Sequence, residues 1–198
     1  ECIYTTPEER SQFRQLVVNS VMATDIFDPE LGALRKARWE KAFASHRPEH
    51  SESSKDTNRK ATIVIEHVIQ ASDVAHTMQH WHIYQSWNQR LFNETYTAYK
   101  NGRCEKDPSE GWYKGELWFF DNYVIPLAKK LKECGVFGVS SDEYLNYAMQ
   151  NREEWERKGR SIVDAMVEQF GRNQQGEDVL NMSACWTIGE GLGESPES

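Results

Sequence analysis

Apolar residues recur along much of the chain three and four positions apart, the spacing that places them on one face of a helix. The first such stretch follows Thr6 and Pro7, a helix start with proline at the first helical position, and ends near Thr24. A second stretch covers residues 29–45. Residues 47–60 contain no apolar aliphatic or aromatic side chain, so we expect a mobile surface loop there.

The most apolar stretch of the chain is residues 61–74, with the sequence ATIVIEHVIQASDV. Its β-branched residues would suit a buried strand, but the stretch is long and leads directly into a helical pattern. We therefore predict a buried helix. The helical pattern then continues over residues 76–101, and Gly102 offers a stop.

A third apolar stripe lies in the second half of the chain and steps by three and four residues through Leu117, Phe120, Val124, Leu127 and Leu131. Pro126 falls inside this stripe and predicts a kink, because proline lacks the backbone N–H that a helix interior needs. Gly135 is expected to end the helix.

The last predicted helix begins at Ser140 and Glu143, which have the spacing of a capping box, and ends at Gly171. Residues 172–198 are rich in Gln, Gly, Glu and Ser, and we expect a mostly disordered tail. No internal repeat, glycine-rich phosphate loop or alternating strand pattern occurs. The predicted fold class is therefore all-α.

Composition narrows the function further. The chain has 198 residues, enough for one domain or a large part of one, and 12% are aromatic, which argues for a packed core. The net charge of −8 argues against a nucleic-acid partner, since phosphate contacts need clustered Lys and Arg. No apolar run approaches the roughly 20 residues that span a bilayer. The four cysteines lie far apart, which favours free thiols in a reducing compartment.

Candidate chemistry gathers in residues 67–82, which hold four of the six histidines. Asp73, His76 and His80 are spaced three and four apart, so on one continuous helix they would share a face. Carboxylate and imidazole are good ligands for Zn²⁺ and other first-row metals. The alternative is a polar helix face whose histidines meet solvent or backbone carbonyls.

Asp73 is notable because it stands at the end of an almost wholly apolar helix. A carboxylate buried there would be costly without a cation, a metal or hydrogen bonds. Its alternative role is a helix-end cap, which Asp often fills.

Glu116 and Phe119 form a second candidate pair, three residues apart and off the apolar stripe. An acid beside an aromatic face can bind a planar ring, with the acid on the ring's edge and Phe stacked on its face. Aromatic residues on a helix more often belong to the core.

Four segments, in order, together resemble the class I cyclic-nucleotide phosphodiesterases. Residues 21–26 (VMATDI) resemble the family's ATD segment, and residues 69–76 (IQASDVAH) resemble its ADxSN segment. Residues 84–96 (YQSWNQRLFNETY) resemble the helix that follows, and residues 115–127 (GELWFFDNYVIPL) resemble its QxxFxxxxxxPL segment. The resemblance covers most of residues 10–160 and implies a multi-helix, HD-type catalytic domain.

The resemblance implies a role for each matched position. Asp73 falls on the family's aspartate metal ligand, and Asp25 falls on a catalytic-pocket acid near the metals. The positions that fall in the nucleotide pocket are His76, Tyr84, Trp87, Leu91, Glu116 and Phe119, with Phe119 on the aromatic that stacks on the purine.

The implied activity is hydrolysis of cAMP or cGMP to the 5′-monophosphate in signal transduction. In such a mechanism Zn²⁺ and Mg²⁺ clamp the cyclic phosphate and lower the pKa of a bridging water, whose hydroxide attacks phosphorus in line. A histidine then protonates the departing 3′ oxygen.

Three positions differ from the family pattern. Glu116 replaces the glutamine that binds the purine, and an ionised carboxylate only accepts hydrogen bonds, whereas an amide also donates. Glu116 would suit a purine edge that offers N–H groups, such as the adenine amine or guanine N1–H. His76 replaces the pocket asparagine, and Pro29 replaces a histidine.

The family's two histidine ligands, its His–Asp pair and its proton-donating histidine all precede the matched region, and no His–Asp dipeptide occurs here. We therefore expect residues 1–171 to be the C-terminal portion of a catalytic domain, incomplete at its N-terminus and inactive alone. The upstream part of the same protein would complete it. The expected setting is cytoplasmic, or the cytosolic side of a larger, membrane-anchored protein.

The sequence also allows two other hypotheses about function. One is a catalytically inactive domain of the same fold that binds nucleotide or a partner. The other is an unrelated helical metal-binding module that uses Asp73, His76 and His80.

Overall fold

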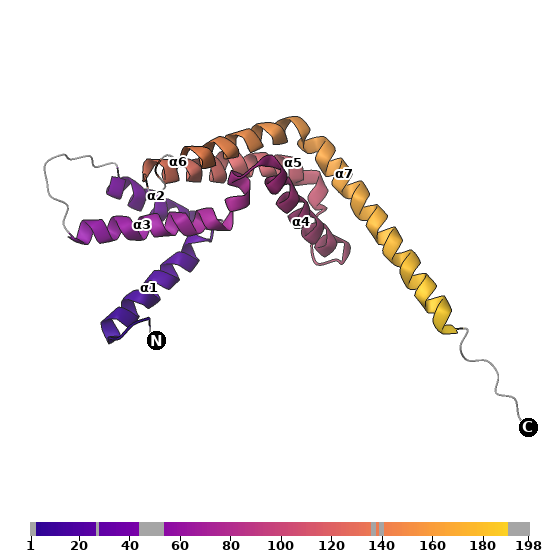
Figure 1. Ribbon diagram of the computed structural model, residues 1–198, viewed down its shortest axis with the longest axis horizontal. Coiled ribbons are helices and arrows are strands. Elements are labelled where there is room, and N and C mark those ends of the chain that lie inside the picture. Colours follow the sequence, from indigo (N-terminus) through magenta and orange to yellow (C-terminus); the bar gives the residue numbers. More distant parts are fainter. Residues whose placement is uncertain (1–2, 27, 44–53, 136–137, 139–140, 190–198) are drawn as a thin grey trace, which may run out of the picture. The chain divides into compact units, whose positions relative to one another are not determined.

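A computed structural model describes residues 3–26, 28–43, 54–135, 138 and 141–189, with backbone alone for residues 54, 55, 141 and 173–189. Every regular element in these ranges is a helix, which confirms the all-α fold class. In chain order the elements are α1 (Pro7–Ala23), α2 (Pro29–Phe43), α3 (Ser54–Asp73), η1 (Ala75–Met78), α4 (Trp81–Lys100), α5 (Pro108–Phe119), η2 (Phe120–Val124), α6 (Ile125–Glu133) and α7 (Ser141–Gly189) (Figure 1).

The chain divides into two compact units. The first combines residues Glu1–Tyr84 with Trp118–Glu153, and the second combines Gln85–Leu117 with Glu154–Ser198. In the described residues no helix is both long and apolar enough to cross a membrane.

Helix α1 begins where the sequence predicted. The Thr6 hydroxyl accepts a hydrogen bond from the Glu9 backbone N–H at 3.1 Å, and Glu9 Oε2 accepts one from the Thr6 N–H at 3.1 Å. This capping box satisfies two N–H groups that would otherwise lack a partner at the helix start.

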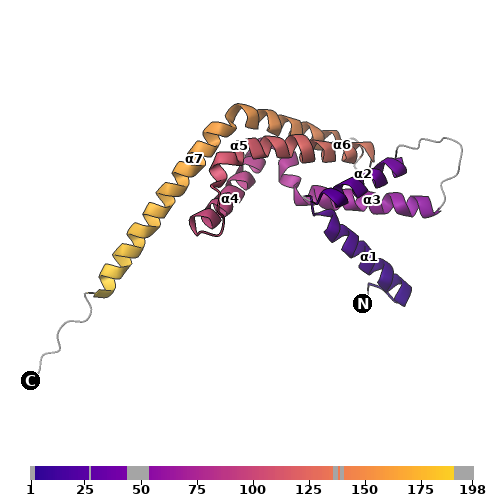
Figure 2. The same cartoon turned by 180° about the vertical axis from the view of Figure 1, so that it is seen from behind.

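Helix α3 is the centre of the first unit and contacts α1, α2 and α6. Figure 2 shows α2 beside α3 from behind. Residues 61–73 are helical, as predicted, and the strand alternative is wrong. The buried positions of residues 61–74 include both apolar and polar side chains: Ile63, Glu66, His67, Gln70, Ala71 and Val74.

The loop expected over residues 47–60 is wrong from Ser54 onward, because α3 begins there. Residues 47–53 lie outside the described residues, as do residues 44 and 45 at the predicted end of the second helix.

The continuous helix expected through residues 76–101 is also wrong, since η1 intervenes and α4 begins only at Trp81. The Thr77 hydroxyl donates to the Val74 carbonyl at 2.6 Å, and the Asn151 amide donates to the carbonyls of Thr77 and Gln79 at 3.0 and 2.7 Å. These side chains occupy backbone acceptors that an uninterrupted helix would use itself. The predicted stop at Gly102 agrees with the structure, where α4 ends at Lys100 and Gly102 has φ 69°.

The predicted interruption at Pro126 appears as a π-helical turn, η2, between α5 and α6. The Ile125 N–H bonds to the Phe120 carbonyl, five residues back. A widened turn of this kind accommodates a residue that cannot donate its own helical bond. Phe120, Val124, Leu127 and Leu131 are buried, which confirms the stripe. Gly135 follows α6 with φ 66°.

The second unit packs aromatic side chains from three helices. The Phe92 ring lies 5.3 Å from Tyr96 and 5.1 Å from Trp112, and Tyr96 lies 5.0 Å from Phe170. Helix α7 continues through Gly171, the predicted end, to Gly189. The division at residue 171 stays a prediction, and Ser140 of the predicted capping box lies outside the described residues.

Candidate functional site

Asp73 is the last residue of α3, and its side chain is exposed rather than buried. One turn earlier, the buried Gln70 donates from Nε2 to the Ala23 carbonyl at 2.7 Å. Ala23 ends α1, two residues before Asp25. This bond therefore joins the helix end that carries Asp73 to the helix end that precedes Asp25.

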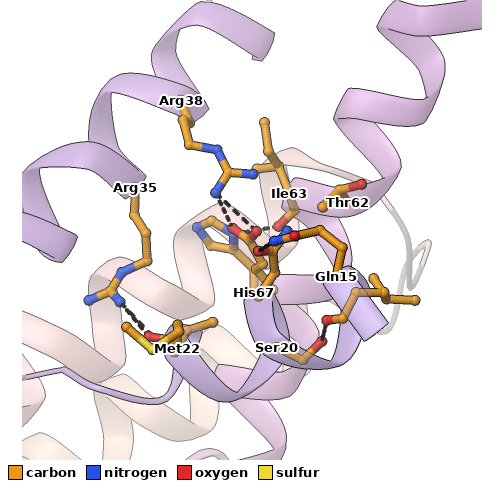
Figure 3. A network of polar contacts seen from close by, with 12 residues as sticks. Gln15, Ser20, Met22, Arg35, Arg38, Thr62, Ile63 and His67 are labelled. Carbon is orange, nitrogen blue, oxygen red and sulfur yellow. Dashed lines mark hydrogen bonds and ion pairs between the residues drawn. The ribbon is translucent and has the colours of Figure 1, made fainter. Parts of the chain in front are cut away.

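Asp25 is exposed in the connection between α1 and α2. Its Oδ1 accepts from the Asp28 N–H at 3.2 Å, while Arg35 donates from Nη2 to the Asp25 carbonyl at 2.9 Å. Arg35 Nη1 also donates to the Met22 carbonyl at 3.3 Å (Figure 3). Arg35 thus supplies hydrogen-bond donors to carbonyls at the end of α1. Its positive charge also interacts favourably with the negative end of the α1 helix dipole.

A second arginine of α2 holds α3. Arg38 Nη1 lies 3.0 Å from both carboxylate oxygens of the buried Glu66. Next to Glu66, His67 Nδ1 lies 2.7 Å from the Ile63 carbonyl, and since a carbonyl only accepts, Nδ1 carries the proton. The His67 ring packs 4.5 Å from Trp39. The Arg38–Glu66 and Trp39–His67 contacts hold α2 against α3, the helix that ends at Asp73.

Burial lowers the pKa of His67 from 6.5 to about 4, despite its bond to the Ile63 carbonyl. Between these pH values the unfolded chain binds a proton that the folded chain does not, so protonation favours unfolding. We expect the free energy of unfolding to decrease as pH falls from 6.5 to about 4, by at most about 3 kcal/mol. Urea unfolding at pH 7 and at a series of lower pH values measures this loss.

The variant His67→Gln replaces the imidazole N–H donor with an amide N–H donor and removes the titrating group. It should show a smaller loss of stability over this pH range. His82→Gln is the matched control, because His82 is exposed. Identical pH dependence in wild type and His67→Gln would contradict the assignment.

The one-face arrangement expected for Asp73, His76 and His80 is wrong, because the three residues do not share one helix. His76 is half-buried in η1. Burial lowers its pKa below the usual value, and the charge of Asp73 offsets only part of this effect. His80 Nε2 lies 3.1 Å from the Tyr147 hydroxyl. Among the described residues, no three His, Cys, Asp or Glu side chains form a group that could hold a metal ion. Asp73 therefore does not fit a metal centre with described residues alone.

Helix α4 carries three predicted pocket residues in two different environments. Tyr84 is 1% exposed and packs edge-on against Phe120, with ring centres 5.2 Å apart. In the second unit Trp87 and Leu91 are each 51% exposed, and the Arg90 guanidinium lies 5.1 Å from the Trp87 ring. Tyr84 thus contributes to the core, whereas Trp87 and Leu91 present apolar side chains at the surface.

Helix α5 carries the other two predicted pocket residues. Glu116, in the second unit, and Phe119, in the first, are both half-buried. Phe119 stacks on Tyr123 with ring centres 5.4 Å apart and an angle of 20° between the planes. Burial raises the pKa of Tyr123 to about 12, so its hydroxyl stays protonated at neutral pH.

The sequence patterns did not predict Arg35 and Gln70 as residues that support the two aspartates. For Gln70 a pattern existed, since it lies on the helical face that also carries Ile63, His67 and Val74. A polar side chain among buried positions indicates a specific hydrogen-bond partner. Arg35 had no comparable pattern in the sequence.

The geometry thus defines an all-helical protein whose candidate site has two aspartates at adjoining helix ends. The model of the 3′5′-cyclic nucleotide phosphodiesterase family matches residues 3–136. This match covers more than half of the chain, so the chain belongs to that family of metal-dependent hydrolases. No curated protein matches the chain.

Proposed function

We propose that the protein hydrolyses 3′,5′-cyclic nucleotides, cAMP or cGMP, to 5′-monophosphates in signal transduction. The family match over residues 3–136 carries this proposal. Further support comes from Asp25 and Asp73, which lie at helix ends joined by the bond from Gln70 to Ala23. The proposed setting is cytoplasmic or cytosol-facing.

Metal dependence of this protein, with Zn²⁺ and Mg²⁺, is part of the proposal. Asp73 would supply one ligand from the exposed end of α3. The remaining ligands, including histidines, would come from an upstream part of the same protein. When bound, such ions supply charge stabilisation for the phosphate and activate water.

The residues proposed to bind the nucleotide are His76, Tyr84, Trp87 and Leu91, together with Glu116 and Phe119 of α5. Phe119 would stack on the purine, because an aromatic face attracts another planar ring. Glu116 would accept hydrogen bonds from N–H groups on the purine edge, since an ionised carboxylate has no proton to donate.

Substituting Glu116→Gln should therefore shift the preference between cAMP and cGMP in the full-length protein. The substitution replaces a negatively charged acceptor with a neutral amide that both donates and accepts. Mispairing one polar group of a base costs about 1–3 kcal/mol. We expect the ratio of kcat/KM for the two nucleotides to change by roughly tenfold. Steady-state hydrolysis of each nucleotide gives this ratio and also tests the activity itself.

Glu110→Gln provides the matched control, because Glu110 is an exposed acid on the same helix. It should leave the ratio unchanged. An unchanged ratio in Glu116→Gln would show that Glu116 does not bind the base.

The second candidate is a non-catalytic domain of the same fold that binds nucleotide or a partner protein. His76 and Glu116 favour it, because they replace the family's pocket asparagine and glutamine. Nucleotide binding without turnover by the full-length, metal-loaded protein would support this candidate and exclude hydrolysis.

A further inference from the structure

The first unit contains a small polar cavity of about 100 Å³ between α2, α3 and the η2–α6 segment. Its polar lining comes from Arg35 of α2, His67 and Gln70 of α3, Tyr123 of η2 and Lys130 of α6. None of these residues is proposed to contact the nucleotide or a metal ion, although Arg35 and Gln70 also bond to the backbone near Asp25. The lining carries cationic groups and hydrogen-bond donors but no acidic side chain.

The two cations of this lining are both half-buried. Arg35 donates to the backbone carbonyls of Met22, Ala23 and Asp25 at 3.3, 3.5 and 2.9 Å, so the partners of its guanidinium are neutral groups at the C-terminal end of α1. Lys130 places Nζ 5.5 Å from the centre of the Trp39 ring, which is also a neutral partner.

Electrostatics around the cavity are consistent with converging positive charge. Burial lowers the pKa of Lys130, and repulsion from Arg35 and Lys36 lowers it further, while attraction to Glu133 and Glu40 raises it. The pKa of His67 is lowered first by burial and then by Lys130 and Arg35. Like charges held together in a partly desolvated place are stabilised by a bound anion.

We propose that this cavity binds a small tetrahedral oxyanion, either inorganic phosphate or the phosphate group of a monoester. Its volume of about 100 Å³ is several times the roughly 10–15 Å³ that one water needs, which leaves room for one such group. Arg35 and Lys130 supply the positive charge. The Tyr123 hydroxyl, protonated at neutral pH, supplies a further donor.

This proposal does not depend on the proposed hydrolase activity, because it requires neither catalysis nor a metal. Its site is built from elements of the first unit alone. The bound anion would strengthen the contact between α2 and α6, since its two cationic partners lie on these two helices.

The test is a titration of the full chain with inorganic phosphate, at constant ionic strength maintained with chloride, followed by isothermal calorimetry. We expect saturable binding to one site. Lys130→Gln should weaken it at least about tenfold, as expected for loss of a charge-assisted contact. Lys129→Gln is the matched control, because Lys129 is the exposed neighbour of Lys130, and it should bind like wild type.

Lys130→Arg keeps the charge and should retain binding, which separates loss of charge from loss of folding. Titration with a nucleoside 5′-monophosphate distinguishes the two sources of the oxyanion, since a Lys130-dependent affinity for the ester alone would assign the site to esterified phosphate. Absence of saturable binding of both probes to wild type would overturn the proposal. Equal weakening in Lys129→Gln and Lys130→Gln would also overturn it.

Discussion

Substituting Asp73→Asn is expected to abolish cyclic-nucleotide turnover by the full-length protein while leaving its fold intact. The side chain is exposed at the end of α3, so its replacement leaves no buried group without a partner. Asparagine keeps the size of the side chain but loses the negative charge that a divalent ion requires. Because changes at residues that merely support metal ligands cost 10- to 100-fold, loss of a ligand should reduce kcat/KM by more than about a hundredfold.

The measurement is hydrolysis of both cyclic nucleotides in the presence of Zn²⁺ and Mg²⁺, with circular dichroism to confirm folding. Asp56→Asn is the matched control, since Asp56 lies in the first turn of the same helix and pairs with Arg59 at its surface. It should retain activity. Near wild-type turnover in Asp73→Asn would contradict the proposed ligand role of Asp73.

The helices that the sequence predicted best are those with a clear local pattern. The start of α1 follows from Thr6 and Pro7, and the burial of Phe120 and Leu131 follows from their helical spacing. By contrast, the break between α3 and α4 depends on Asn151, whose amide bonds to the Thr77 carbonyl 74 residues earlier. A local pattern of apolar residues contains no information about such a distant donor.

The candidate site shows the same division. The position of Asp73 at the end of an apolar helix was visible in the sequence and is confirmed. The support of this site by Arg35 and Gln70 was not visible, because both side chains bond to backbone carbonyls, which every residue has. The exposure of Asp73 likewise depends on how α3 packs against α1, α2 and α6, which spacing alone does not determine.

The largest effect on stability is expected at Trp155, which is 0% exposed in the second unit. Its indole Nε1 donates to the Tyr113 carbonyl at 3.1 Å, and the Tyr113 hydroxyl donates to the Glu156 carbonyl at 3.1 Å. A Cβ at Gly159 would lie 2.8 Å from Trp155 Cε2, so glycine at this position lets the indole pack closely against the backbone of its own helix, α7. Trp155→Ala would leave a cavity and remove the bond from the indole to the Tyr113 carbonyl, at a cost of about 3–5 kcal/mol.

Urea unfolding of the chain, followed by circular dichroism, measures this loss as a lower transition midpoint. Trp118→Ala removes the same side chain from a position where it is 56% exposed, and should change stability by less than about 1 kcal/mol. Trp155→Phe retains most of the buried ring but not the N–H donor, so its cost should fall between the two. Burial is the property that distinguishes these two tryptophans. Equal costs for Trp155→Ala and Trp118→Ala would therefore show that packing of Trp155 against the Tyr113 region of α5 does not stabilise the second unit.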